Sequence, residues 1–214
     1  MSDTTVIIKT IGRKTLKAAI ASAKREGFKT IVISDGVKTS APGANQFIRL
    51  GRQWGNYGGM AANVGAALAE TEFITFLDDD DQFIPGAGHV LRECLRIKAM
   101  IDIWIAGVRF SRNVRMVNTK TGEENYRGTD LAIWPEKGLR EGNVAMPTYR
   151  TKIFEKIPFI NAVPDDVAHM TDLLHVQACA SKGYSVDWVG EALYLVRPHA
   201  TDSQGIDSVN GQGR

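Results

Sequence analysis

The sequence predicts an α/β fold in a single domain, with a mostly parallel central sheet flanked by helices. Short apolar runs rich in β-branched residues alternate with stretches of helical periodicity, which is the pattern of βαβ units. The 214 residues are 43% hydrophobic and 23% charged, enough for one sizeable core. Four consecutive aspartates, Asp78 to Asp81, end one of the predicted strands. Ligands bind beyond the carboxyl ends of strands in such sheets, so this cluster marks a candidate site.

The first three elements form one βαβ unit. Residues 5–8 are an apolar run typical of a buried strand, and residues 30–34 are a second run of the same type. Between them, residues 14–26 place apolar side chains on one helical face, and Gly27 is a natural C-terminal stop. A unit of this kind predicts two parallel strands joined by a right-handed crossover.

The same alternation continues along the rest of the chain. Residues 37–59 are polar and glycine-rich, and only a short strand near residues 47–50 is predicted there. Residues 112–142 mix polar and β-prone residues around Thr121 and Gly122, which predicts a hairpin or an irregular excursion. The other predicted helices are residues 60–69, 88–100, 151–156 and 170–182, and the other predicted strands are residues 71–77, 101–110, 185–189 and 192–196.

The last residues are rich in Gly, Ser, Gln and Asn and predict a flexible tail. The expected organisation is therefore one domain over residues 1–200 and a C-terminal tail over residues 201–214. The net charge of +2 is too small to indicate nucleic-acid binding by itself. No apolar run approaches the ~20 residues that span a bilayer, and the N-terminus lacks the layout of a signal peptide. Cys94 and Cys179 lie in predicted helices without metal-binding spacing, which fits a reducing, cytoplasmic location.

The four aspartates carry most of the functional information. Four like charges repel one another and raise their own pKa values, so the arrangement is costly without a compensating cation. Mg²⁺ and Mn²⁺ take oxygen ligands and supply that charge. The alternative is an acidic turn in which one aspartate caps the helix that follows residues 82–86. Because a cap needs one carboxylate and the sequence has four, the metal-linked interpretation is preferred.

A series of short motifs then follows in order along the chain. The motifs are residues 6–13, a strand ending in Lys-Thr-Ile-Gly-Arg; residues 34–36, Ser-Asp-Gly; residues 56–65, which contain Ala-Ala-Asn-Val-Gly; residues 76–81, Phe-Leu-Asp-Asp-Asp-Asp; residues 170–172, Met-Thr-Asp; and residues 194–203, which contain Tyr-Leu-Val-Arg-Pro-His. Over nearly the whole chain this series resembles the family-2 glycosyltransferases of GT-A fold, a Rossmann-like arrangement. The resemblance implies a divalent metal, Mn²⁺ or Mg²⁺, and the transfer of a sugar from a nucleotide-sugar donor with inversion. The acceptor is an unidentified glycan, lipid, protein or nucleic acid.

The resemblance also implies a role for individual residues. It assigns donor binding to Thr10, Arg13, Asp35, Asn63, Asp78 and Asp79, metal binding to Asp80 and His199, and the role of general base to Asp172. Residues 78–80 form its Asp-x-Asp element. The family's usual Pro, Arg and Glu are replaced here by Lys9, Ala62 and Thr171.

Each of these assignments has a simpler alternative. Asp35 before Gly36 is a common turn sequence, and Asp172 could cap its helix, with Asp165 and Asp166 as other candidates for the base. The remaining histidines, His89, His169 and His175, are interpreted as surface or packing residues.

Two rival functions are kept beside the glycosyltransferase. A nucleotidyltransferase acting on a sugar phosphate also combines metal carboxylates with a Rossmann-like sheet, but it usually has a glycine-rich phosphate loop after the first strand. Residues 9–13 contain only one glycine, Gly12. A non-catalytic module that binds a nucleotide or carbohydrate is the second rival, and the intact aspartate cluster argues against it.

Overall fold

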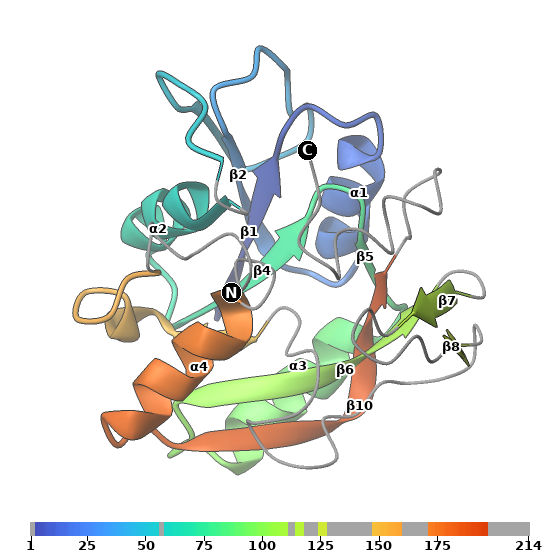
Figure 1. Ribbon diagram of the computed structural model, residues 1–214. Coiled ribbons are helices and arrows are strands. Elements are labelled where there is room, and N and C mark those ends of the chain that lie inside the picture. The colour runs from blue at the N-terminus through green and yellow to red at the C-terminus, as the bar shows by residue number, and fades with distance from the viewer. Residues whose placement is uncertain are drawn as a thin grey trace.

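The main feature of the fold is an eight-stranded sheet, seen in a computed structural model that describes residues 3–55, 58–110, 114–117, 124–127, 147–159 and 171–196. The strand order across this sheet is β3-β2-β1-β4-β9-β6-β10-β5 (Figure 1). Four neighbouring pairs of strands are parallel and three are antiparallel. The predicted α/β class, with a central sheet flanked by helices, is confirmed.

The parallel half of the sheet contains the elements that the sequence predicts best. Strands β1 (Thr4–Thr10), β2 (Lys29–Ser34), β3 (Gln46–Arg49) and β4 (Phe73–Asp78) run parallel to one another. Helix α1 (Leu16–Arg25) connects β1 to β2 and completes the predicted βαβ unit. Because β1 pairs with β4 so that Lys9 lies opposite Asp78, the ends of these two strands meet at one edge.

The other half of the sheet is mixed. Strand β9 (Thr148–Arg150) lies antiparallel between β4 and β6 (Ile103–Phe110). Strand β10 (Val186–Val196) runs parallel to β6, and β5 (Gln82–Phe83) is antiparallel to β10. Strands β5 and β9 have two and three residues, too few to show a periodicity, and the sequence did not predict them.

Three other predictions have different outcomes. The prediction of separate strands at residues 185–189 and 192–196 is wrong, because β10 is one strand. Its register shifts between Trp188 and Tyr194, around Gly190 with a φ of 71°, so the strand bends without ending. The predicted excursion contains β7 (Val114–Val117) and β8 (Glu124–Arg127), which pair in antiparallel fashion. The predicted short helix at residues 151–156 is a 3₁₀ turn, η2 (Thr151–Ile153).

Helices cover both faces of the sheet. The side chains of Val6 and Ile8 face α1 and α3 (Ala87–Ile97), while Ile7 between them faces α2 (Gly59–Leu68) and α4 (Thr171–Ser181). In Figure 1, α4 lies in front of β6 and β10, with α3 behind them. None of the helices in the described ranges has the length and apolar character needed to cross a bilayer.

Two glycines in these layers allow very close packing. At Gly65 of α2, a Cβ would lie 2.3 Å from Cγ2 of Ile7, so the helix approaches β1 closely. At Gly88 of α3, a Cβ would lie 2.3 Å from the carbonyl oxygen of Glu26. Such distances exclude any side chain at either position.

Helix α3 begins without help from the aspartates. Its N-cap is Gly86, and the carboxylate of Glu26 accepts the amide hydrogens of Gly86 and Gly88 at 3.1 and 3.0 Å. The amides of Ala87 and His89 donate to backbone carbonyls. Since these first amides have partners, the alternative in which one of the four aspartates caps this helix is wrong.

His175 on α4 is part of the core, in agreement with its predicted packing role. Its side chain is buried, its Nδ1 lies 3.2 Å from the hydroxyl of Tyr149, and its Nε2 lies 2.8 Å from the carbonyl oxygen of Ile157. Phe154 and Phe159 pack against its ring. Burial lowers the pKa of His175 below its usual value of 6.5, although the carbonyl of Ile157 opposes part of this shift.

This burial predicts a pH-dependent stability. As the pH falls below about 6.5, the unfolded chain takes up a proton at this position before the folded protein does, so the free energy of unfolding decreases. The decrease ends once the pH is below the folded-state pKa. We expect His175→Gln to be less stable than the parent but to lose this part of the pH dependence. Urea unfolding between about pH 5 and pH 7.5 measures the free energy of unfolding of both proteins as a function of pH.

The exposed His89 on α3 provides the control. The part of the pH dependence that is lost in His175→Gln should persist in His89→Gln. A pH profile of His175→Gln parallel to that of the parent would contradict the assignment of the effect to His175.

Candidate functional site

The four aspartates form a tight turn at the carboxyl end of β4. The amide of Asp81 donates to the carbonyl oxygen of Asp78 at 3.1 Å, which closes the turn. The side chains are exposed to very different degrees: 48% for Asp78, 14% for Asp80 and 0% for Asp79. Asp81 is also buried. Four identical residues therefore occupy four different environments.

Asp79 joins this turn to the loop after β1. Its carboxylate accepts hydrogen bonds from the hydroxyl of Thr10, from the amides of Ile11 and Arg13, and from the guanidinium of Arg13 at 2.6 Å. A carboxylate with no exposed surface is stable only when its oxygens are hydrogen-bonded in this way. The structure thus shows Asp79, Thr10 and Arg13 bound to one another, and their contact with a donor stays a prediction.

The other three aspartates form a group that could hold a metal ion. One carboxylate oxygen from each of Asp78, Asp80 and Asp81 lies within 4.8 Å of the others. Carboxylate oxygens are the ligands that Mg²⁺ and Mn²⁺ prefer, so the residues present fit such an ion. Asp80 and His199 were predicted from the sequence as metal ligands, but Asp81 was not. Its place as the fourth of four consecutive aspartates was the signal that could have identified it. His199 lies outside the described residues.

Two cations border the aspartates. Nε of Arg13 lies 3.8 Å from Asp80, and Nζ of Lys9 lies 3.0 Å from Asp78. Burial lowers the pKa of both side chains, but the neighbouring carboxylates outweigh it and raise the pKa above the usual value in each case. For Lys9 these carboxylates are Asp78, Asp172 and Asp81 in order of effect.

The structure brings the predicted base close to this cluster. Asp172 lies in the first turn of α4, far from the aspartates in sequence, yet its charge acts on Lys9. Burial, followed by the charge of Asp172, raises the pKa of Tyr149 well above 10.0. Burial is also the main reason that the pKa of Tyr194 rises to about 12, with a smaller contribution from Asp172. Asp172 is therefore near the ends of β1 and β9, on the face covered by α4.

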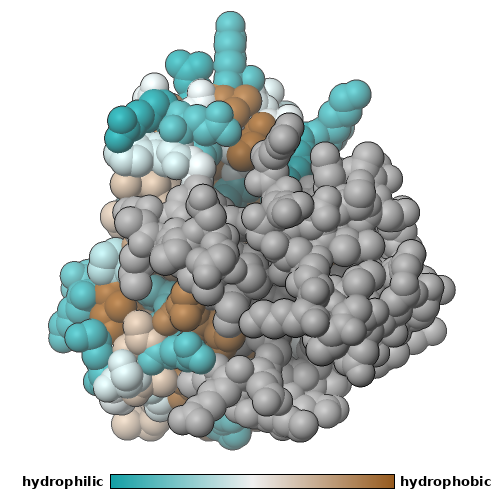
Figure 2. Space-filling view, in the orientation of Figure 1, coloured by the Kyte–Doolittle hydropathy of each residue, from teal (hydrophilic) through white to brown (hydrophobic). Residues whose placement is uncertain are grey.

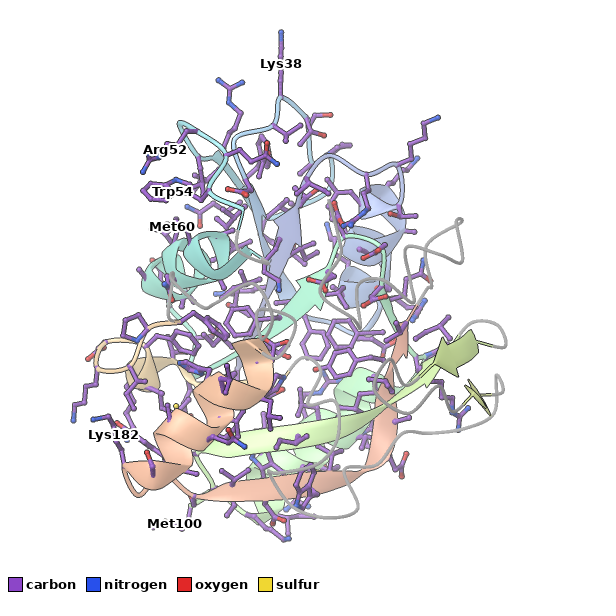
Figure 3. The ribbon with its side chains drawn as sticks, viewed as in Figure 1. Lys38, Arg52, Trp54, Met60, Met100 and Lys182 are labelled. Carbon is purple, nitrogen blue, oxygen red and sulfur yellow. The ribbon has the colours of Figure 1, made fainter. Side chains whose placement is uncertain are left out.

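Asp35 makes two hydrogen bonds that were not predicted from the sequence. It is buried at the end of β2, and its two oxygens accept the amide hydrogens of Trp54 and Gly55 at 2.9 and 2.8 Å. The guanidinium carbon of Arg52 lies 3.8 Å from the centre of the Trp54 ring, and Figure 3 shows this pair above the start of α2 near Met60. Asp35 thus holds a loop that presents a partly exposed aromatic ring.

The surroundings of the site are polar. Figure 2 shows that the top of the molecule, where the loops after β1, β2 and β3 lie, is mainly hydrophilic with a small apolar area. Asn63 of α2 lies below this edge and bonds to the backbone of Phe159 in both directions, at 3.1 and 2.8 Å. Its predicted contact with the donor stays a prediction.

The chain is similar to known proteins in sequence and in fold. The model of the family described as Glycosyl transferase family 2 matches residues 5–157. A crystal structure of S. aureus TarS 1-349 is similar, with a TM-score of 0.68 and 16% identity over 95% of this chain and 62% of that chain. The same protein in complex with UDP-GlcNAc gives a TM-score of 0.60 and 15% identity, over 92% of this chain and 58% of that one.

A third structure, CMP:2-keto-3-deoxy-manno-octonic acid synthetase with CTP, has a TM-score of 0.50 and 13% identity, over 86% of this chain and 88% of that one. At these identities the likeness shows the fold alone. The chain spans 62% of the TarS 1-349 structure and 38% of a longer TarS structure. No curated protein sequence matches it significantly.

The unequal environments of Asp79 and Asp80 predict unequal effects of the same substitution. Asp79→Asn places an amide against four hydrogen-bond donors in a buried site and should reduce the free energy of unfolding by about 3 kcal/mol. Asp80→Asn removes one of several like charges and should change the stability of the metal-free protein by less than about 0.5 kcal/mol. Urea unfolding in the presence of EDTA measures both. Equal losses in the two variants would show that Asp79 does not have the structural role inferred here.

Proposed function

The chain belongs to glycosyltransferase family 2, and we propose that it transfers a sugar from a nucleotide-sugar donor to an acceptor hydroxyl with the help of a divalent metal. The fold is of GT-A type, as expected from the motifs. The observation that carries the proposal is the grouping of three carboxylate oxygens, from Asp78, Asp80 and Asp81. A fourth carboxylate, that of Asp172, acts electrostatically on Lys9, the lysine paired with Asp78. A leaving diphosphate and an attacking hydroxyl need these two kinds of group at one site.

The proposed chemistry divides between the two groups. Asp80, with Asp78 and Asp81, would hold the metal, and a metal bound there would neutralise the charge that develops on the diphosphate oxygens. Asp172 accepts the proton of the acceptor hydroxyl while the hydroxyl oxygen forms a bond to the anomeric carbon of the sugar. The bond from that carbon to the diphosphate breaks, and the nucleoside diphosphate leaves. Attack from the side opposite the leaving group inverts the configuration of the sugar.

The donor is proposed to carry a uridine base. UDP and UDP-GlcNAc are bound in the similar structures of TarS, and this supports the choice for the present chain. Arg52 covers one face of the Trp54 ring, but the ring is partly exposed in a loop held by Asp35, so its other face is a candidate for stacking on a base. The acceptor and the cytoplasmic location stay predictions.

The nucleotidyltransferase alternative has one structural argument in its favour and one against it. The synthetase that binds CTP is similar in fold over most of both chains. A triphosphate site, however, needs backbone amides after the first strand that point at the phosphates. Here the amides of Ile11 and Arg13 donate to Asp79 instead. Release of nucleoside diphosphate supports the transferase, and release of pyrophosphate supports the alternative.

Metal-dependent nucleotide binding tests the proposal directly. In a panel of UDP, GDP, ADP, CDP and dTDP, we expect UDP to raise the melting temperature most in the presence of Mn²⁺, because a ligand of the native state stabilises it. Asp80→Asn should remove the metal-dependent part of this rise. Glu93→Gln, an equal change of charge on α3, should leave it intact. A rise that survives in Asp80→Asn would remove Asp80 from the site.

A substitution of Asp172 tests whether this residue acts as a general base or only stabilises the fold. Asp172→Asn keeps the size of the side chain but cannot accept the proton, so transfer at saturating donor should fall by roughly 10²–10⁴-fold. Binding of the nucleoside diphosphate should stay unchanged, because the base faces the acceptor. If Asp172 only stabilises the start of α4, asparagine replaces it well and the rate stays near that of the parent. That result would contradict its assignment as the base.

A further inference from the structure

Lys9 is a residue of the candidate site whose position suggests a function of its own. It is the last but one residue of β1, directly opposite Asp78 in the pairing with β4. Its side chain is only 16% exposed, and its Nζ lies 3.0 Å from an oxygen of Asp78. A lysine held this deeply next to a possible metal ligand is not a solvated surface charge.

The path of the Lys9 side chain is fixed by α2. Gly58, the N-cap of this helix, has a φ of 78°, and a Cβ there would lie 2.9 Å from Cδ of Lys9 and 3.4 Å from its Cβ. The methylene groups therefore run directly beneath the start of the helix. This packing holds the ammonium at the carboxyl edge of the sheet, because the stem has little room to turn away.

The ammonium of Lys9 interacts electrostatically with the proposed metal ligands and with the proposed base. Its ion pair is with Asp78 of the metal-binding set, and the charges of Asp172 and Asp81 also act on it. The cation thus interacts both with the carboxylates that would hold the metal and with the carboxylate that would act as the base. Lys9 thus adds one positive charge to the candidate donor site.

Such a charge has two opposite effects on the ligands of the site. It competes with a divalent cation for Asp78, which weakens metal binding. It also offers N–H donors and a positive charge to phosphate oxygens, which strengthens binding of a diphosphate. Both effects make the binding of a diphosphate less dependent on the metal.

We propose that Lys9 is a built-in cation of the donor site, which shares Asp78 with the divalent metal and binds a diphosphate oxygen of the donor. The proposal rests on the function proposed above and adds to it a nucleotide affinity that persists without metal. Lysine has the right chemistry for this, since its ammonium is a compact point charge with three donors.

Binding measurements with and without metal test the proposal without any need for an acceptor. Isothermal titration with the best nucleoside diphosphate of the panel is performed in Mn²⁺ and in EDTA. The parent should bind in both conditions. Lys9→Met, which keeps the length of the stem, should lose about tenfold or more in affinity in EDTA and much less in Mn²⁺, because a charge-assisted contact of this kind is worth more than 1.4 kcal/mol. Titration with Mn²⁺ alone should show tighter binding in Lys9→Met than in the parent.

Two further variants serve as controls. Lys17→Met makes the same change of charge on the exposed face of α1 and should match the parent in every titration. Lys9→Arg keeps the charge and should retain most of the binding in EDTA. The melting temperature of each variant confirms that it is folded before it is titrated.

The outcomes separate this inference from the proposed function. A parent protein that binds no nucleoside diphosphate of the panel, even with Mn²⁺, overturns the proposed function and the inference with it. A parent that binds only with Mn²⁺ keeps the function and overturns the role of Lys9. Equal losses for Lys9→Met in Mn²⁺ and EDTA, or unchanged affinity for Mn²⁺ alone, overturn the sharing of Asp78.

Discussion

The buried carboxylate of Asp79 is the interaction on which the arrangement of the site depends. It has no exposed surface, so its charge is tolerable only because four N–H and O–H groups from residues 10–13 donate to it. By binding these groups it fixes the turn after β4 against the loop after β1. The neighbouring aspartates are then held in one small group, even though they repel one another. The hydrogen bonds to the carboxylate of Asp79 thus keep the carboxylates of the other three aspartates close together.

Much of the fold could be predicted because the long strands and helices have clear local patterns. The apolar, β-branched residues of β1, β2 and β4 and the one-sided periodicity of α1 are local signals, and all of these elements are present. Strand β9 has no such signal, since three residues between β4 and β6 are defined only by their partners. The bend of β10 at Gly190 was likewise invisible, because a glycine inside a strand pattern also fits a break between two strands.

The candidate site shows the same limit. That the aspartates would lie at the carboxyl edge of the sheet followed from their place after a strand, and the structure shows them there. How the four would divide their roles did not follow, because Asp79 acts on a threonine 69 residues away and the sequence does not show that contact. Glu26 at the start of α3 and the bond between Asn63 and Phe159 are of the same kind. Long-range partners decide whether a polar residue serves the ligand or the fold, and a single sequence does not display them.

The position of β9 also determines when the sheet can be completed as the chain is synthesised. As the chain is synthesised, β4 forms one of its two pairings with β1, which precedes it, but its other edge waits for residues 148–150. Until then a strand with five consecutive buried residues, Phe73 to Leu77, keeps an unpaired backbone edge. Open edges of apolar strands favour association between chains. Any fragment that stops before residue 148 therefore keeps this edge of β4 unpaired, and the three residues of β9 complete the sheet.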